Sequence, residues 1–126
     1  MARLVELARR AQQHAYAPYS GFPVGAAVLT EDGRVFLGCN VENSSFGLTV
    51  CAERNAVAAA VVAGSRPVAV AVVTNRDHVG PCGACRQVLH EFAPEMPVIT
   101  AAQEGDEVRV GSLGELLPEA FVFKAG

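Results

Sequence analysis

Short apolar blocks alternate with polar segments along this chain, and the spacing inside each block indicates its secondary structure. Between Arg3 and Ala15 the apolar residues recur every three or four positions, which predicts an amphipathic helix. Two β-prone runs follow, Val24–Thr30 and Val35–Val41, and the Asp-Gly pair between them is a typical hairpin signal. The segment Cys51–Ala63 is rich in Ala and Val and is followed by a glycine. It predicts a helix with almost no polar face, which must therefore be buried.

The second half of the chain repeats a strand–helix order. Val68–Thr74 is apolar throughout, as expected for a central strand that is covered on both faces. Cys82–Phe92 predicts a helix that ends before a proline, and Pro97–Ala102 predicts another strand. Weaker signals indicate a strand at 107–110 and a short helix at 113–117.

This order of elements predicts an α/β fold, a three-layer α/β/α sandwich around a central mixed sheet of about five strands. With 126 residues, of which 51% are apolar, the chain suits one domain with one core, spanning residues 1–126. Charged residues make up only 18% of the chain, against about a quarter in a typical protein, which favours a surface partly covered in an oligomer.

Charge and hydropathy argue against two classes of partner. The net charge is −3 and the ten Lys and Arg residues are scattered, so a nucleic acid is not expected to bind. The longest apolar run, Ala56–Ala63, has eight residues, whereas a membrane span needs about 20. The N-terminal segment, Met1–Tyr16, is amphipathic and lacks the apolar region of a signal peptide, which predicts a cytoplasmic protein.

Three of the four cysteines have the spacing of a metal site. Cys82 and Cys85 form a C-x-x-C motif at a predicted helix start, where the helix dipole favours the thiolate that binds metal. Cys51 opens the other helix and can supply a third ligand. Three protein ligands leave one tetrahedral position of zinc open for water, which is typical of a catalytic site. Glu53 completes a Cys-x-Glu motif, which together with Pro-Cys-x-x-Cys is the signature of zinc-dependent nucleobase deaminases, with the Glu as the acid and base.

Two other interpretations use the same cysteines. A lone C-x-x-C is often a redox pair, and Cys39 could close a structural zinc site with four thiols. The redox alternative requires neither Cys51 nor Glu53, and Cys39 lies in a predicted strand, where a small buried thiol is the commoner outcome. The histidines do not pair at ligand spacing and are interpreted as non-ligands: His14, His78 and His90.

Three thiolates outweigh the charge of one Zn²⁺, so the site needs positive charge nearby. The two helix N-termini supply part of it. Arg54 directly follows Glu53 and Arg86 directly follows Cys85, so either could donate a hydrogen bond to a thiolate sulfur and tune the metal. Arg54 is the preferred candidate, because Arg86 is more readily explained as an ordinary surface residue.

Beyond the two zinc motifs, much of the chain resembles the small homotetrameric cytidine deaminases. The blocks that carry the resemblance occur in order and cover nearly the whole length: Ala15–Ala27, Gly38–Asn43, Cys51–Ala56, Pro81–Val88 and Leu116–Phe121. The resemblance implies a homotetramer with sites at its subunit interfaces and one zinc per subunit. It implies hydrolysis of cytidine and 2′-deoxycytidine to uridine and 2′-deoxyuridine with release of ammonia, a reaction of pyrimidine salvage.

The resemblance also implies roles for individual residues. Glu53 would move protons between the attacking water, ring nitrogen 3 and the leaving amine. Asn40 and Glu42, two apart on one strand face, would bind the ribose hydroxyls. Phe22 would pack on the pyrimidine ring, and Phe121 would reach the base in a neighbouring subunit. Position alone suggests two backbone contacts to the base and its amine, the N–H of Ala52 and the carbonyl of Gly80.

The chain departs from the family pattern at two places. Phe46 stands where many members have Tyr, and the C-terminal tail differs, so either Phe121 or Phe123 could make the contact between subunits.

A related deaminase acting on antibiotics, nucleotides or nucleic acid is one alternative to a cytidine deaminase. The absence of a basic cluster and the Asn40/Glu42 pair favour a free nucleoside over these. A zinc-stabilised module without catalysis is the other alternative, and it requires Cys39 as a fourth ligand.

Overall fold

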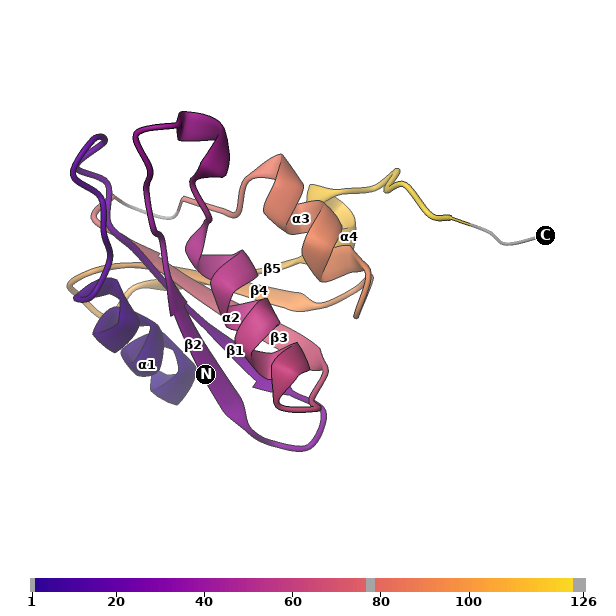
Figure 1. Ribbon diagram of the computed structural model, residues 1–126. Helices are drawn as coiled ribbons and strands as arrows, with labels where there is room; N and C mark the ends of the chain where they lie inside the picture. Colours follow the sequence, from indigo (N-terminus) through magenta and orange to yellow (C-terminus); the bar gives the residue numbers. More distant parts are fainter. Residues whose placement is uncertain (1, 77–78, 124–126) are drawn as a thin grey trace.

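The computed structural model describes residues 2–76 and 79–123, and within them a five-stranded sheet carries helices on both faces (Figure 1). The strands are β1 (Val24–Thr30), β2 (Val35–Cys39), β3 (Pro67–Thr74), β4 (Pro97–Ala102) and β5 (Val108–Ser112). The helices are α1 (Ala2–Gln12), the 3₁₀ turn η1 (Phe46–Leu48), α2 (Ala52–Val62), α3 (Gly83–His90) and α4 (Leu113–Leu116). The predicted order of elements is confirmed.

The sheet is mixed, with strand order β2-β1-β3-β4-β5. β1 and β2 form the predicted antiparallel hairpin, and Gly33 in its turn has a φ of 82°, which favours glycine. β3 is antiparallel to β1 and parallel to β4, and β5 is antiparallel to β4. The continuous apolar run therefore lies at the centre of the sheet, as predicted, because a strand covered on both faces has no polar side.

Two apolar clusters separate the three layers. On one face, α1 buries Leu4, Val5 and Ala8 against the sheet. On the opposite face, α2, α3 and α4 bury one another's apolar residues against β1, β3 and β4 (Figure 1). The three-layer α/β/α prediction is confirmed, and both cysteine-bearing helices lie on the same side of the sheet.

One glycine sets how closely α2 approaches β2. A Cβ atom added to Gly38 would lie 2.3 Å from the carbonyl oxygen of Ala52 and 2.5 Å from the amide nitrogen of Ala56. Real Cβ atoms do not approach backbone this closely, so only glycine lets the first turn of α2 lie directly on β2. This contact places the start of α2, and with it Cys51, against the sheet.

Two predicted details differ from the structure. β2 ends at Cys39 rather than Val41, because Val41 leaves the ladder and forms isolated bridges to Tyr16 and Val50. Cys39 is half-buried rather than fully buried. The predictions that concern His78 and the last three residues lie outside the described part of the chain.

Among the described residues, none of the helices combines the length and apolar character needed to cross a bilayer.

Candidate active site

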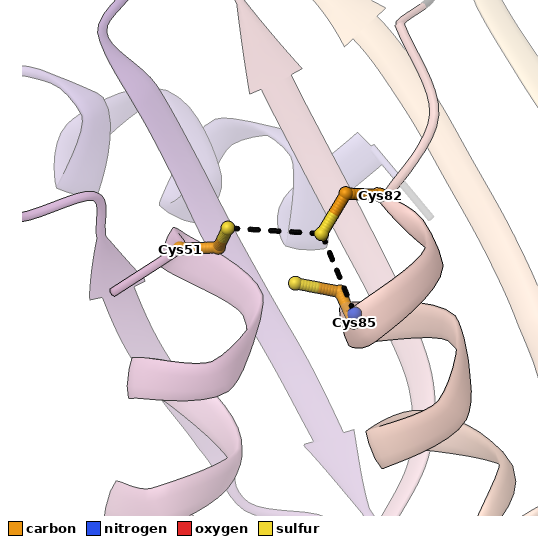
Figure 2. Close-up of side chains that lie close together, drawn as sticks. All are labelled: Cys51, Cys82 and Cys85. Carbon is orange, nitrogen blue, oxygen red and sulfur yellow. Dashed lines mark hydrogen bonds between the residues drawn. The ribbon is translucent and has the colours of Figure 1, made fainter. Parts of the chain in front are cut away.

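The three predicted ligands meet at the N-termini of two helices. Cys51 is the N-cap of α2, Cys82 is the N-cap of α3, and Cys85 lies in the first turn of α3. Their Sγ atoms all lie within 4.8 Å of one another, and Figure 2 shows the side chains converging from the two helices. Cys39 does not belong to this group of described residues and instead lines a separate cavity with Arg10 and His14. Its position argues against the closed four-thiol site.

The spacing of the sulfurs suits a tetrahedral metal. The Sγ atoms of Cys51 and Cys82 are 3.8 Å apart. Two thiolates bound tetrahedrally at the usual Zn–S length of about 2.3 Å lie about 3.8 Å apart. A disulfide would need about 2.05 Å. The separation of Cys51 and Cys82 therefore matches two sulfurs that share one metal ion, and these two residues are not joined by a disulfide.

The pKa values of the clustered cysteines also favour a metal site. A hydrogen bond from Cys85 lowers the pKa of Cys51 to about 5, and Arg54 and Cys82 add to the effect. The same hydrogen bond raises the pKa of Cys85. Protein groups alone thus favour one thiolate at Cys51 beside a neutral thiol at Cys85. A bound divalent cation would let all three sulfurs ionise, and the helix N-termini favour that charge.

Arg54 is the arginine that the structure brings to the cluster. Its Nη2 lies 3.6 Å from Cys51 Sγ and 3.4 Å from the carbonyl oxygen of Thr49. Arg86 is used differently, because its Nε donates to the Pro81 carbonyl at 2.8 Å and its Nη1 to the Leu116 carbonyl at 3.0 Å. Arg54 therefore matches the predicted contact with sulfur, whereas Arg86 joins α3 to the loop before it and to α4.

Glu53 is buried beside the sulfurs, with only 4% of its surface exposed. Burial is the largest cause that raises the pKa of its carboxyl group to about 7, and the negative charge of Cys51 contributes to this shift. A carboxyl group with a pKa near neutrality can both accept and release a proton at physiological pH. Its placement in the first turn of α2 follows from the Cys-x-Glu spacing, which puts it two residues after the Cys51 cap.

The segment after β2 is fixed next to the start of α2. Val41 exchanges backbone hydrogen bonds with Val50, at 2.9 and 3.0 Å, and Val50 immediately precedes Cys51. On its other side, the Asn40 carbonyl accepts from Tyr16 N–H and the Glu42 N–H donates to the Tyr16 carbonyl, both at 2.9 Å. The segment that carries both predicted ribose contacts therefore lies beyond the end of β2, not on the strand, and it is attached to the chain that enters the cysteine cluster.

Asn40 uses its amide to hold the backbone around Phe22. Its Nδ2 donates to the Phe22 carbonyl and its Oδ1 accepts from Val24 N–H, both at 2.9 Å, and the residue is 7% exposed. These bonds leave one amide hydrogen of Asn40 for another partner. Phe22 itself is half-buried, with the Arg76 guanidinium 5.2 Å from its ring centroid. The structure thus brings Asn40 and Phe22 together, as the predicted base and ribose contacts require.

Glu42 faces a cavity of about 430 Å³ that it lines with Tyr19, Ser20, Phe46 and Thr49. The rings of Tyr19 and Phe46 meet edge to face, with centroids 5.9 Å apart. Phe46 is nevertheless 74% exposed. Ala52, the first residue of α2, is fully buried, and the first N–H groups of a helix have no partner within the helix.

Phe121 lies apart from these residues in the single chain. It is 73% exposed, and Phe123 is 79% exposed, on the C-terminal segment that extends away from the sheet (Figure 1). The backbone of Phe121 is held by Gln87, whose Nε2 donates to the Phe121 carbonyl at 2.9 Å and whose Oε1 accepts from its N–H at 3.2 Å. The chain therefore presents Phe121 outward in a defined position.

Three supporting residues were missed by the sequence analysis. Gln87 holds Phe121, Asn55 donates to the Cys39 carbonyl at 2.9 Å, and Ser20 bonds to Glu42. Each joins segments that are distant in sequence, and their residue types are common on surfaces, so spacing gives no signal for them. All three nevertheless lie inside or next to the motif blocks, which was the only available indication.

Comparison with known proteins agrees with this site. The family model described as the cytidine and deoxycytidylate deaminase zinc-binding region matches residues 1–101. A cytidine deaminase of Sporosarcina psychrophila is 48% identical over 122 residues, covering 94% of this chain and 89% of that protein. A cytidine deaminase of Mycobacterium tuberculosis is 49% identical over 116 residues, covering 90% of this chain and 84% of that protein.

Solved structures show the same fold. The crystal structure of a cytidine deaminase from Burkholderia pseudomallei has a TM-score of 0.89 and 53% identity, and the match covers 95% of this chain and 98% of that one. The residues that the family model matches, 1–101, include both motifs that build the cysteine cluster, Cys51-Ala52-Glu53 and Cys82–Cys85. The chain therefore belongs to the family of zinc-binding cytidine and deoxycytidylate deaminases.

Proposed function

We propose that this protein is a cytidine deaminase of one catalytic domain, which hydrolyses cytidine and 2′-deoxycytidine to uridine and 2′-deoxyuridine and releases ammonia. The observation that carries the proposal is the buried Glu53 beside three convergent thiols. A structural zinc site needs four protein ligands and no buried carboxyl group of raised pKa. The relatives named cytidine deaminase, at 46–49% identity over most of the chain, support the same reaction.

Cys51, Cys82 and Cys85 would hold one zinc per subunit, and the metal would supply an activated water as the nucleophile for carbon 4 of cytosine. Glu53 performs the proton transfers. It takes a proton from the attacking water, delivers it to ring nitrogen 3, and later carries a proton to the amino group that leaves as ammonia. Burial of Glu53 supports this role, because it raises the carboxyl pKa to the range in which both directions of transfer are accessible.

The substrate is proposed to bind across the start of α2. The ring of Phe22 packs on the pyrimidine, while the Ala52 N–H and the Gly80 carbonyl contact the base and its amine. The ribose hydroxyls bind Glu42 and the remaining amide hydrogen of Asn40. The negative charge of Glu42 favours a free nucleoside, because a 5′-phosphate would add a second negative charge to the cavity that Glu42 lines.

An ultraviolet assay of the purified protein tests the proposal, with cytidine, 2′-deoxycytidine, cytosine and cytidine 5′-monophosphate as substrates, beside a zinc measurement. We expect turnover of both nucleosides with stoichiometric ammonia and bound zinc. Turnover of the monophosphate alone would indicate a nucleotide deaminase. Bound zinc without turnover of any substrate would indicate a structural module.

The proposed enzyme is a homotetramer with its sites at subunit interfaces, and it acts in the cytoplasm, where thiols stay reduced. Exposed large apolar side chains support the assembly, because contact between subunits would remove their surface from water. The five most exposed are Phe46, Leu48, Val62, Phe121 and Phe123. Phe121 of one subunit would contact the base in a neighbour. Sedimentation equilibrium of the wild type and of Phe121→Ala tests the tetramer, and the KM of Phe121→Ala for cytidine tests the contact with the base.

A further inference from the structure

Ser20 connects two of the residues that the proposed function assigns to the substrate. It lies in the exposed turn Ala17–Gly21, which a hydrogen bond of 3.1 Å closes and in which Gly21 has a φ of 65°. Its hydroxyl donates to Glu42 Oε2 and accepts from the N–H of Phe22 at 3.0 Å. A single side-chain oxygen therefore bonds to both Glu42 and Phe22.

The same turn also engages the other oxygen of Glu42. Oε1 accepts from the N–H of Tyr19 at 2.9 Å and from the N–H of Ser20 at 3.1 Å. The hydroxyl of Ser20 is the largest cause that lowers the pKa of Glu42, followed by these backbone bonds. Both carboxylate oxygens are thus held before any substrate binds; the two backbone bonds use both lone pairs of Oε1, whereas Oε2 keeps one lone pair for a further donor.

We propose that Ser20 is a positioning residue, which fixes the carboxylate of Glu42 for the sugar hydroxyls and holds it in register with the Phe22 ring; this inference rests on the proposed function. Two backbone bonds to Oε1 fix the position of that oxygen but still allow the carboxylate group to rotate about it. The Ser20 hydroxyl removes that rotation by holding Oε2. A hydroxyl of the sugar then meets an acceptor that is already oriented, and less conformational freedom is lost on binding.

A purely structural role for Ser20 makes a different prediction. A serine that only stabilises the turn would affect all substrates equally when it is replaced. A serine that acts through Glu42 affects only substrates with sugar hydroxyls, and it acts chiefly on KM. The loss of a hydrogen bond to a charged group corresponds to a change of roughly tenfold or more in binding.

The test compares wild type, Ser20→Ala and Ser20→Thr, as zinc-loaded full-length enzymes, with cytidine and with 2′,3′-dideoxycytidine, which lacks both ring hydroxyls. We expect Ser20→Ala to lower kcat/KM for cytidine about tenfold, mostly through KM, and to change kcat/KM for the dideoxynucleoside less than about twofold. Ser20→Thr keeps the hydroxyl and should restore the cytidine value. Equal losses on both substrates, or no loss on cytidine, would overturn the proposal.

A double-mutant cycle with Glu42→Ala shows whether Ser20 affects cytidine turnover through Glu42. If Ser20 acts through Glu42, adding Ser20→Ala to Glu42→Ala has no further effect on cytidine turnover, whereas an undiminished further loss contradicts the proposal. The activity of the wild type distinguishes a failure of the proposed function from a failure of the proposed role of Ser20. An inactive wild type rejects the proposed function together with this role, and an active wild type without the substrate-dependent effect rejects only the role of Ser20.

Discussion

Cys51 and Cys82 lie 31 positions apart in the sequence, yet their sulfurs are 3.8 Å apart because the helices they cap start side by side on one face of the sheet (Figure 2). Each helix directs its positive N-terminal end toward the pair. Gly38 contributes to this arrangement from the sheet, since only glycine allows the backbone of α2 to approach β2 so closely. The pairing of the two thiols is therefore a property of the fold as much as of the motif.

Replacing Cys82 with serine should abolish zinc binding and activity and lower thermal stability. The change leaves two of the three thiols, and a metal held by two ligands binds far more weakly. Zinc content by atomic absorption and melting by circular dichroism measure the effect. The matched control is Cys39→Ser, which changes a half-buried thiol outside the cluster and should retain zinc. Loss of zinc in Cys39→Ser would revive the four-thiol site.

Replacing Glu53 with glutamine should lower kcat by about 10²–10⁴-fold while zinc stays bound, because the amide keeps the shape of the side chain but cannot carry protons. Steady-state kinetics with cytidine and a zinc measurement on the same preparation test this. Turnover near the wild-type rate would remove Glu53 from the proton transfers. Loss of zinc together with activity would show that Glu53 supports the metal site instead.

Local patterns predicted the elements well where a single segment determines the outcome. Val24–Thr30 and Pro97–Ala102 form strands with the predicted boundaries, because their apolar character is continuous and turn residues flank them. The two zinc-motif helices were also placed correctly to within a few residues, since cap and stop residues mark their ends.

Contacts between segments that are distant in the sequence were harder to predict. Nothing in the local sequence indicates that Gly38 lies under Ala52, or that the amide of Asn40 is largely used to hold the backbone beside Phe22. Arg54 and Arg86 also look alike as residues that follow a functional side chain. Helix spacing does not separate them, because Arg54 comes three residues after the Cys51 cap and Arg86 four residues after the Cys82 cap. Only the tertiary contacts do so: Arg54 reaches Cys51 Sγ, whereas Arg86 donates to two backbone carbonyls.

This difference between the two arginines predicts different phenotypes. Arg54→Ala removes the donor 3.6 Å from Cys51 Sγ and should weaken zinc binding about 10–100-fold, with a corresponding fall in activity at limiting zinc. Arg86→Ala removes the bonds to the Pro81 and Leu116 carbonyls and should lower the melting temperature with less effect on zinc affinity. Competition with a chelator measures the affinity of each variant. Equal zinc affinities in the two variants would contradict the role of Arg54.

A carboxylate far from the metal should govern part of the acid sensitivity of the fold. Asp32, in the β1–β2 turn, accepts from the hydroxyl groups of Thr30 and Ser65 and pairs with Arg34 at 2.9 Å. The pKa of Asp32 is lowered from 3.8 to about 2; the Thr30 hydrogen bond is the largest cause, and Ser65 and Arg34 contribute to the same shift. The charged form is therefore the one that the folded state favours.

The sign of the pH dependence follows from that shift. A depressed pKa in the folded state stabilises the protein above pH 3.8, and this stabilisation is lost as the pH falls toward about 2. Asp32→Asn should thus be less stable than wild type at pH 7, and the difference in urea midpoint should shrink between pH 4 and pH 2. Both proteins lose zinc in acid, so the difference between them isolates Asp32. A difference that stayed constant over this range would mean that the substitution acts through packing of the turn and not through the charge of the carboxylate.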